Sequence, residues 1–244
     1  MRNCKSVILI ILILNLAGCH KNPCDELDNG VYVYPEEKAK GKSFEESIEL
    51  YKIPESILEC ISTWDLVESC IYYPEMRIIW THSHLQGGFD KVKAMCNGFE
   101  ELWRREDKFT VLMALYSGLN FEREWDVYTD LENGRFMDNI IRYELILTQN
   151  EILLDLTQSE KIELFQMAIE IQKTKTDNME YYDIVGIQTS LAILARIMYN
   201  DNFQPLIEEY ENNESMRIFI DYIKILDSDI INIIMNLSEN FKKL

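Results

Sequence analysis

"IVGIQTSLAILARIM", residues 184–198, is the stretch that decides the fold class. Its apolar residues recur at steps of three, four, three and four along the chain. This spacing places them on one face of an α-helix. The residues concerned are Ile184, Ile187, Leu191, Leu194 and Met198.

The same spacing continues on both sides of this stretch. It recurs at Phe136, Met137, Ile140, Ile141 and Leu145, and again at Ile223, Leu226, Ile230, Ile234, Leu237 and Phe241. Between residues 135 and 244 the only helix-breaking residues are Gly186 and Pro205. No segment alternates cleanly enough to build a sheet. The sequence therefore predicts an all-α fold of roughly nine or ten helices in an antiparallel array, either solenoid-like helix pairs or an irregular multi-helix bundle.

Helix boundaries are indicated by residues that start or stop helices. Pro54 suits a first helical position, since its missing N–H would be unpaired there anyway. Ser62-Thr63 offers an N-cap for "WDLVESCIYY", and Pro74 stops that helix. Asn97-Gly98 is expected to end the helix "FDKVKAMC", and Gly118 to end "KFTVLMALY".

The N-terminus has the pattern of an export signal. Arg2 and Lys5 precede an apolar run over residues 6–17, which is too short to span a bilayer. Leu16-Ala17-Gly18-Cys19 resembles the lipobox of bacterial lipoproteins. That resemblance implies cleavage before Cys19 and attachment of lipid to its thiol. The alternatives are an ordinary secretory signal and a short uncleaved anchor.

This pattern divides the chain into three parts. We expect a lipoprotein signal peptide at residues 1–18, a lipidated Cys and polar tether at 19–50, and a single all-helical domain at 51–244. "VYVY" at 31–34 could dock as an extended strip. His20, in a position where Asp often marks inner-membrane retention, favours the outer membrane of the cell envelope. Whether the domain faces the periplasm or the outside stays open.

The net charge of −18 argues against nucleic acid as a partner. An acidic chain is also repelled by anionic headgroups, so the expected membrane contact is the lipid on Cys19 alone. Cys60, Cys70 and Cys96 stand among apolar residues, where a free thiol behaves as a small hydrophobe. We predict three buried thiols in preference to a bridge, although export would permit disulfides with Cys24.

Two of the tryptophans are candidate binding residues. Trp80 and Trp103 belong to a set of four, all within residues 64–125. Aromatic clusters can stack on sugars or anchor a partner, but they are also ordinary core residues. Trp103 is the better candidate because it stands in "EELWRRED". There Glu100–Arg104 and Glu101–Arg105 have the spacing of helix ion pairs, although the arginines could also bind an anion.

His82, His84 and Asp90 are weak candidates for a metal site. Residues two apart do not share a helix face, so the two histidines could act together only in an extended segment. Surface or helix-capping roles are the favoured interpretation. The chain has no G-x-S-x-G, H-E-x-x-H, phosphate loop or Rossmann motif, so no catalytic residue and no cofactor is implied.

Three stretches, "IPESILECISTWDLVESCIYYPEM", "QGGFDKVKAMCNGFEELWRREDKFTVLMALY" and "FMDNIIRYELILTQNEILLDLTQSEKIELFQMAIE", resemble an uncharacterised family of all-helical Bacteroidota lipoproteins. The matching positions are Pro54-Glu55, Ser62-Thr63, Tyr73-Pro74, Gly88-Phe89 and Asn97-Gly98. The resemblance covers about residues 53–200. It implies an all-α lipoprotein and carries no activity, and the two histidines lie outside its pattern.

These observations favour a lipid-anchored envelope protein that acts as a binding or interaction module for a protein or glycan. The alternative is an enzyme of unrecognised class that acts on envelope or extracellular polymers. A purely structural envelope protein is the third possibility. A cleft with exposed aromatic residues would favour the first of these, whereas His82, His84, Asp90 or a carboxylate pair in the main cleft would favour the second.

Overall fold

The computed structural model of the protein describes residues 22–27 and 29–242. Its regular structure there consists of fourteen α-helices and three 3-10 helices (η1–η3), without a β-strand, which confirms the all-α prediction. The sequence predicts fewer helices because several of them are single turns of four residues. In chain order the elements are η1 Pro23–Glu26, α1 Glu36–Ala39, α2 Phe44–Leu50, α3 Glu55–Leu58, α4 Thr63–Ile71, η2 Pro74–Thr81, α5 Leu85–Met95, α6 Asn97–Arg104, α7 Lys108–Ser117, η3 Trp125–Val127, α8 Asp130–Leu147, α9 Asn150–Leu153, α10 Gln158–Asp177, α11 Met179–Asn200, α12 Gln204–Asn212, α13 Glu214–Tyr222 and α14 Asp229–Phe241.

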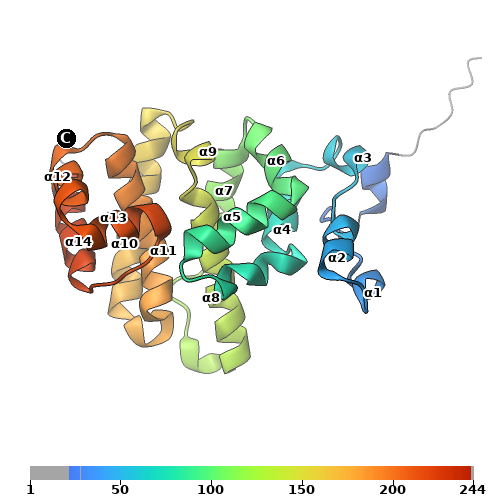
Figure 1. Ribbon diagram of the computed structural model, residues 1–244, viewed down its shortest axis with the longest axis horizontal. Coiled ribbons are helices and arrows are strands. Elements are labelled where there is room, and N and C mark those ends of the chain that lie inside the picture. The colour runs from blue at the N-terminus through green and yellow to red at the C-terminus, as the bar shows by residue number, and fades with distance from the viewer. Residues whose placement is uncertain (1–21, 28, 243–244) are drawn as a thin grey trace, which may run out of the picture.

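The helices form a row that follows the order of the chain, with α1–α3 at one end and α12–α14 at the other (Figure 1). Neighbours in sequence are mostly neighbours in space: α4 packs on α6 and α7, α7 on α8, α10 on α11, and α12 on α13. The contact of α14 with α11 closes the C-terminal half, and the contact of α13 with α5 joins this half to the preceding part of the row. The array therefore combines a solenoid-like succession with a closed C-terminal bundle.

The stretch 184–198 forms most of α11, which differs from the amphipathic helix that its spacing predicts. From Gly186 to Met198 every residue except Arg196 is buried, because α8, α10, α13 and α14 all pack against this helix. Ile184, expected on the apolar face, is 39% exposed. It follows a kink at Asp183, whose φ of 48° and ψ of −173° interrupt the helix. Helix α11 is thus the central helix of the array.

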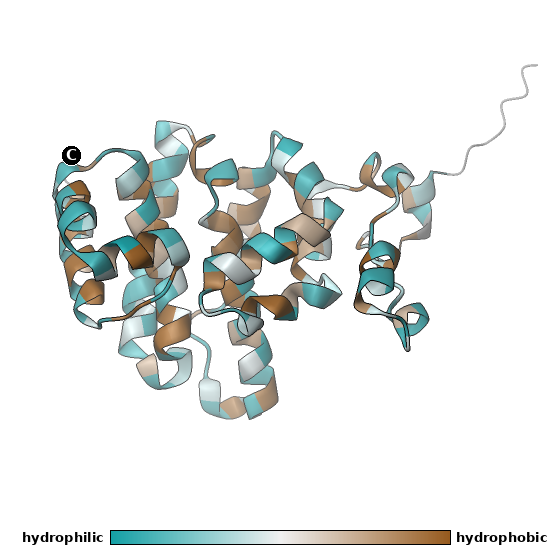
Figure 2. Ribbon diagram, in the orientation of Figure 1, coloured by the Kyte–Doolittle hydropathy of each residue, from teal (hydrophilic) through white to brown (hydrophobic). Residues whose placement is uncertain are grey.

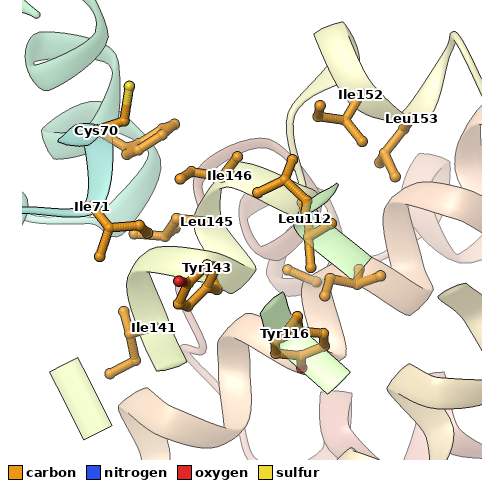
Figure 3. Close-up of a cluster of buried hydrophobic side chains, with 14 of the residues drawn as sticks. Cys70, Ile71, Leu112, Tyr116, Ile141, Tyr143, Leu145, Ile146, Ile152 and Leu153 are labelled. Carbon is orange, nitrogen blue, oxygen red and sulfur yellow. The ribbon is translucent and has the colours of Figure 1, made fainter. Parts of the chain in front are cut away.

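Apolar side chains from several helices meet in one continuous core. Figure 2 shows the hydrophobic positions gathered on the faces where helices meet and the hydrophilic ones on the outer faces. Figure 3 shows part of this core, where Ile71 of α4, Leu112 and Tyr116 of α7, Leu145 of α8 and Ile152 of α9 lie together. Burial of this surface is the main favourable contribution to folding.

Helices begin at residues that can cap them. The Ser62 hydroxyl accepts the backbone N–H of Asp65 at 3.1 Å at the start of α4, which confirms the predicted cap. Thr129 and Thr157 form full capping boxes at the starts of α8 and α10. These contacts satisfy N–H groups that have no partner within the helix. Helix α7 ends at Ser117 before Gly118, also as predicted.

Asn97-Gly98 begins α6, whereas the sequence predicts that this pair ends the preceding helix. The Asn97 side chain binds the backbone of Ile53 on both sides, donating to its carbonyl at 2.8 Å and accepting its N–H at 2.9 Å. A Cβ on Gly98 would lie 3.0 Å from Sγ of Cys70. Both residues are therefore explained by tertiary contacts, which local sequence signals do not reveal.

The C-terminal apolar pattern also spans two elements. Helix α13 ends at Tyr222, and Ile223 adopts the left-handed conformation with φ of 52°. Leu226 lies between the helices and is 53% exposed, and α14 begins only at Asp229. The apolar spacing thus runs across the break between α13 and α14. Ile223 belongs to the pattern because it is buried in the core, although it lies outside both helices.

Residues 22–50 are folded over their described part, whereas the sequence predicts a polar tether there. The strip at 31–34 docks on α4: the backbone N–H of Tyr32 donates to Oγ of Ser69, and the Tyr34 hydroxyl donates to the Ser69 carbonyl, both at 3.0 Å. Tyr34 is buried, with its ring 5.5 Å from that of Tyr73 in an edge-to-face contact. Alternate residues of an extended chain share a face. Tyr32 and Tyr34 therefore both face the core and pack the segment against it.

A disulfide links Cys24 to Cys60, with a Cα–Cα distance of 6.0 Å. The prediction of a free thiol at Cys60 is therefore wrong. Cys60 is half-buried two residues after the end of α3, and the folded N-terminal segment brings Cys24 beside it. Cys70 and Cys96 are free and buried, as predicted.

A fully buried ion pair lies between α8 and α10. Lys175 donates to both carboxylate oxygens of Glu144, at 2.7 and 2.6 Å, and to the carbonyl of Gly186 at 2.7 Å. The hydroxyls of Tyr116 and Thr189 donate to the same carboxylate. Both charged side chains have no exposed surface. Burial lowers the pKa of Lys175, and the Glu144 carboxylate opposes this effect.

We expect Lys175→Met to reduce the free energy of unfolding by about 3–5 kcal/mol, because it leaves the Glu144 carboxylate buried without a counter-charge. Lys173→Met is the matched control on the same helix. Lys173 pairs with Glu239 at 3.0 Å in solvent, so its loss should cost less than about 1 kcal/mol. Urea unfolding measures both values. Equal losses in the two variants would contradict the role of the buried pair.

We expect reduction of the Cys24–Cys60 bridge to cost about 2–4 kcal/mol, because the bridge limits the conformational freedom of the unfolded chain. Chemical unfolding with and without reductant measures this cost, and the double variant Cys24→Ser, Cys60→Ser should be insensitive to reductant. Peptide mapping of the unreduced protein should recover the two cysteines in one linked species. Alkylation of both thiols without reductant would contradict the bridge.

Candidate functional site

A cleft of about 810 Å³ opens between η2, η3, α8 and the start of α11. These elements come from three separate parts of the chain. They contribute aromatic, acidic and amide side chains to one surface. The cleft is lined by Arg77, Trp80, Trp125, Asp126, Tyr128, Asp130, Asn133, Gly134, Met137, Asp138, Ile141, Arg142, Glu180, Tyr181, Asp183 and Val185.

The floor of the cleft is an aromatic stack built on Trp125, which is only 6% exposed. The ring of Tyr181 lies parallel to it, with centroids 5.0 Å apart and an interplanar angle of 5°. Tyr182 and Phe136 meet the same indole edge-on, at 4.9 and 5.8 Å. Together with Ile140 these residues form a small core of their own. The floor is therefore fixed by packing.

A guanidinium already lies against this aromatic cluster. Arg123 places its Cζ 3.7 Å from the ring centroid of Tyr128, 4.5 Å from that of Phe136 and 5.4 Å from that of Trp125. Cations are attracted to the negative faces of aromatic rings. The aromatic cluster beside the cleft therefore already holds one cation, the guanidinium of Arg123.

Trp80 forms the opposite wall and is 44% exposed. Its indole N–H donates to Oδ1 of Asp138 at 3.1 Å, and Asp138 in turn pairs with Arg142 at 2.5 Å. The wall is positioned by a close backbone approach at Gly88 of α5. A Cβ there would lie 2.5 Å from Cα of Ile79, so glycine permits η2 to pack on α5 and sets the position of the next residue, Trp80.

Four further carboxylates border the cleft: Asp126, Asp130, Glu180 and Asp183. Asp130 and Glu180 occupy first turns of helices, where the helix dipole favours negative charge. Asp183 accepts the backbone N–H groups of Val185 at 2.6 Å and Gly186 at 3.1 Å, which stabilises its left-handed φ. Within residues 22–27 and 29–242, none of the four carboxylates takes part in an ion pair. Both arginines of the cleft are paired, Arg77 with Glu75 and Arg142 with Asp138.

The two tryptophans singled out from the sequence differ in their surroundings. Trp80 lines the cleft, whereas Trp103 lies on α6 and stacks on Phe99 at a centroid distance of 5.6 Å, at the edge of the core. The charged residues around Trp103 form the expected helix pairs, Glu100–Arg104 at 2.5 Å and Glu101–Arg105 at 2.7 Å. The structure therefore brings Trp80, and not Trp103, into the cleft.

His82, His84 and Asp90 are not gathered around one point. Nδ1 of His84 accepts the backbone N–H of Gly87 at 2.9 Å and so caps α5, and its ring lies 4.7 Å from that of Tyr222. His82 is exposed, with Nδ1 3.2 Å from the Ile78 carbonyl. In the part of the chain that the structure describes, no group of three or more His, Cys, Asp or Glu side chains is placed to hold a metal ion.

Asp90 lines a second, polar cavity of about 460 Å³. Its neighbour Lys93 pairs with it at 3.3 Å and with Glu151 at 3.3 Å. Lys93 therefore bridges Asp90 of α5 and Glu151 of α9. The cavity lies at the junction of α5, α9, α11 and α13.

Arg196 crosses the same junction from α11. It donates to the carbonyls of Thr148 at 3.1 Å, Ile220 at 3.0 Å and Asp221 at 3.1 Å, and to Oε1 of Gln86 at 2.7 Å. Burial lowers the pKa of Arg196 to about 10. Because these carbonyls stand at the C-terminal ends of α8 and α13, the helix dipoles favour the cation there.

Sequence reasoning missed Trp125, Tyr128 and Tyr181 as parts of one site. Trp125 and Tyr181 are 56 positions apart by their numbers, and nothing in either local pattern indicates contact. The weak signal was the acid-rich aromatic segment "FEREWDVYTD" at 121–130, which has no apolar periodicity. The predicted lipidation residue, Cys19, lies outside the described residues.

Comparison with protein-family models, with curated proteins and with solved structures finds no match to the chain. The resemblance to helical Bacteroidota lipoproteins therefore stays a prediction. No helix among the described residues combines the length and the apolar character needed to cross a bilayer.

We expect Trp125→Ala to reduce the free energy of unfolding by about 3–5 kcal/mol, because it removes the buried ring on which the floor of the cleft is stacked. Trp80→Ala should cost about 1 kcal/mol, since that side chain is half exposed and loses one hydrogen bond. Urea unfolding of the two variants tests this difference. A loss for Trp80→Ala as large as that for Trp125→Ala would show that the wall, too, is part of the core.

Proposed function

We propose that this protein is a lipid-anchored protein of the cell envelope, held at the outer membrane through Cys19, that binds a protein or a glycan in its aromatic cleft. The observation that carries the proposal is the cleft itself, with the packed Trp125–Tyr181 floor and the exposed ring of Trp80. Rigid aromatic faces provide large contact area at low entropic cost. We propose binding in preference to catalysis, because a rigid aromatic surface is sufficient for binding.

Export is supported by two independent features. The first is the lipobox-like Leu16-Ala17-Gly18-Cys19 after a short apolar run. The second is the Cys24–Cys60 disulfide, because disulfides persist in oxidising compartments such as the periplasm and the cell surface. Cys24 follows the proposed lipid attachment site within a few residues. The bridge would therefore fix the folded domain close to its anchor.

An enzyme acting on envelope or extracellular polymers is the second candidate, and the carboxylates of the cleft favour it. Glycoside hydrolysis uses two carboxyl groups on either side of the scissile bond. Asp126 and Asp130 are exposed in the cleft and are the residues to test. His82 and His84, the weak metal-site candidates of the sequence, do not line the cleft and therefore do not support an enzyme there.

Cross-linking in intact cells, followed by affinity purification and mass spectrometry, tests the binding role. We expect one dominant cross-linked partner, a protein or a glycan-bearing species, which is lost in the Cys19→Ala variant because that variant is no longer anchored. The Trp80→Ala variant should keep the anchor and recover less of the partner. Capture of abundant membrane proteins alone, unchanged by either substitution, would contradict the proposal. Hydrolysis of envelope polysaccharide that Asp126→Asn or Asp130→Asn abolishes would favour the enzyme.

A further inference from the structure

The charge of the cleft indicates what kind of partner it fits. Its two arginines pair with Glu75 and Asp138, and one further guanidinium, that of Arg123, lies against the aromatic rings beside it. Four carboxylates line the cleft without an ion pair among the described residues: Asp126, Asp130, Glu180 and Asp183. The helix dipoles at Asp130 and Glu180 supply only partial positive charge. The cleft therefore keeps an excess of negative charge around its aromatic surface. The whole chain, at −18, adds to this field.

The aromatic rings of the cleft suit a cation as well. Trp80 is 44% exposed, so its ring is accessible to a ligand. Tyr128 is equally exposed, but Arg123 already covers one face of its ring. The protein's own Arg123 already lies 3.7 Å from the centroid of Tyr128. A guanidinium or ammonium group entering from outside would meet the same chemistry: an aromatic face for the cation and the apolar stem, and a carboxylate for the charge.

We propose that the cleft binds a lysine- or arginine-bearing segment of a partner polypeptide. The inference rests on the proposed binding function and names its partner class. Trp80 would receive a basic side chain over its face, as Tyr128 receives that of Arg123, and Asp126 and Glu180 would pair with the charged head. A volume of about 810 Å³ holds one or two long side chains and the backbone that joins them.

The test measures binding of fluorescent hexa-arginine and hexa-lysine peptides to the full-length chain in nonionic detergent, by fluorescence anisotropy. Hexa-glutamate and a neutral glucose hexasaccharide are the comparison ligands. We expect the basic peptides to bind and the other two not to bind. Affinity should fall as salt is raised, because salt screens exposed charge pairs.

Paired variants separate the cleft from the general acidity of the surface. Asp126→Asn with Glu180→Gln should weaken binding about fivefold or more, whereas Glu208→Gln with Glu211→Gln, which removes two exposed charges from α12, should change it less than about twofold. Trp80→Ala should weaken binding about threefold. Trp64→Ala is its control, because Trp64 is 48% exposed on α4 and does not line the cleft.

Several outcomes would overturn the inference. Equal losses in the cleft and α12 variants would mean that the peptides bind the acidic surface at large. Binding of the hexasaccharide, sensitive to Trp80→Ala, would assign the cleft to glycans and leave the proposed binding function standing. A cross-linked partner in cells that is unaffected by Asp126→Asn with Glu180→Gln would likewise keep the function and reject the basic segment.

Discussion

One buried ion pair constrains how the central helices of the fold pack. Glu144 and Lys175 have no exposed surface, and a charged side chain removed from water is costly unless every polar contact is satisfied. Here the carboxylate receives the ammonium and the hydroxyls of Tyr116 and Thr189, and the ammonium also reaches a backbone carbonyl of α11. The network draws on α7, α8, α10 and α11. Its geometry constrains the relative position of these four helices. A shift of α8 or α10 would separate the two buried charges, and a shift of α7 or α11 would remove a hydrogen bond from one of them.

The packing of α8 and α11 around this ion pair also determines the shape of the cleft. The carbonyl that Lys175 binds belongs to Gly186, three residues after the strained turn at Asp183. That turn starts the buried part of α11, and the residues before it place Tyr181 against Trp125. The opposite wall is set by backbone contact between η2 and α5. The aromatic floor therefore follows from the way the buried charges fix α8 and α11.

Sequence patterns predict the local features of this fold and miss its long-range ones. The caps at Ser62 and the stop at Gly118 are local signals, and the structure confirms them. The ion pair was not predictable, since Glu144 and Lys175 are two among 66 charged residues (42 acidic and 24 basic) and nothing nearby marks them as buried. The cleft and the partner of Cys60 share this difficulty. Each joins segments whose proximity is decided only when the helices pack.

Hydrogen exchange of the native protein, followed by mass spectrometry, tests the dependence on the ion pair most directly. Amides that exchange only through global unfolding mark the part of the structure that holds the rest together. The account predicts that the slowest amides lie in α8 around Glu144, in α10 around Lys175 and in α11 from Gly186 to Met198. It would be contradicted if α4–α6, which lie outside the ion-pair network, kept their protection while α10 and α11 exchanged first.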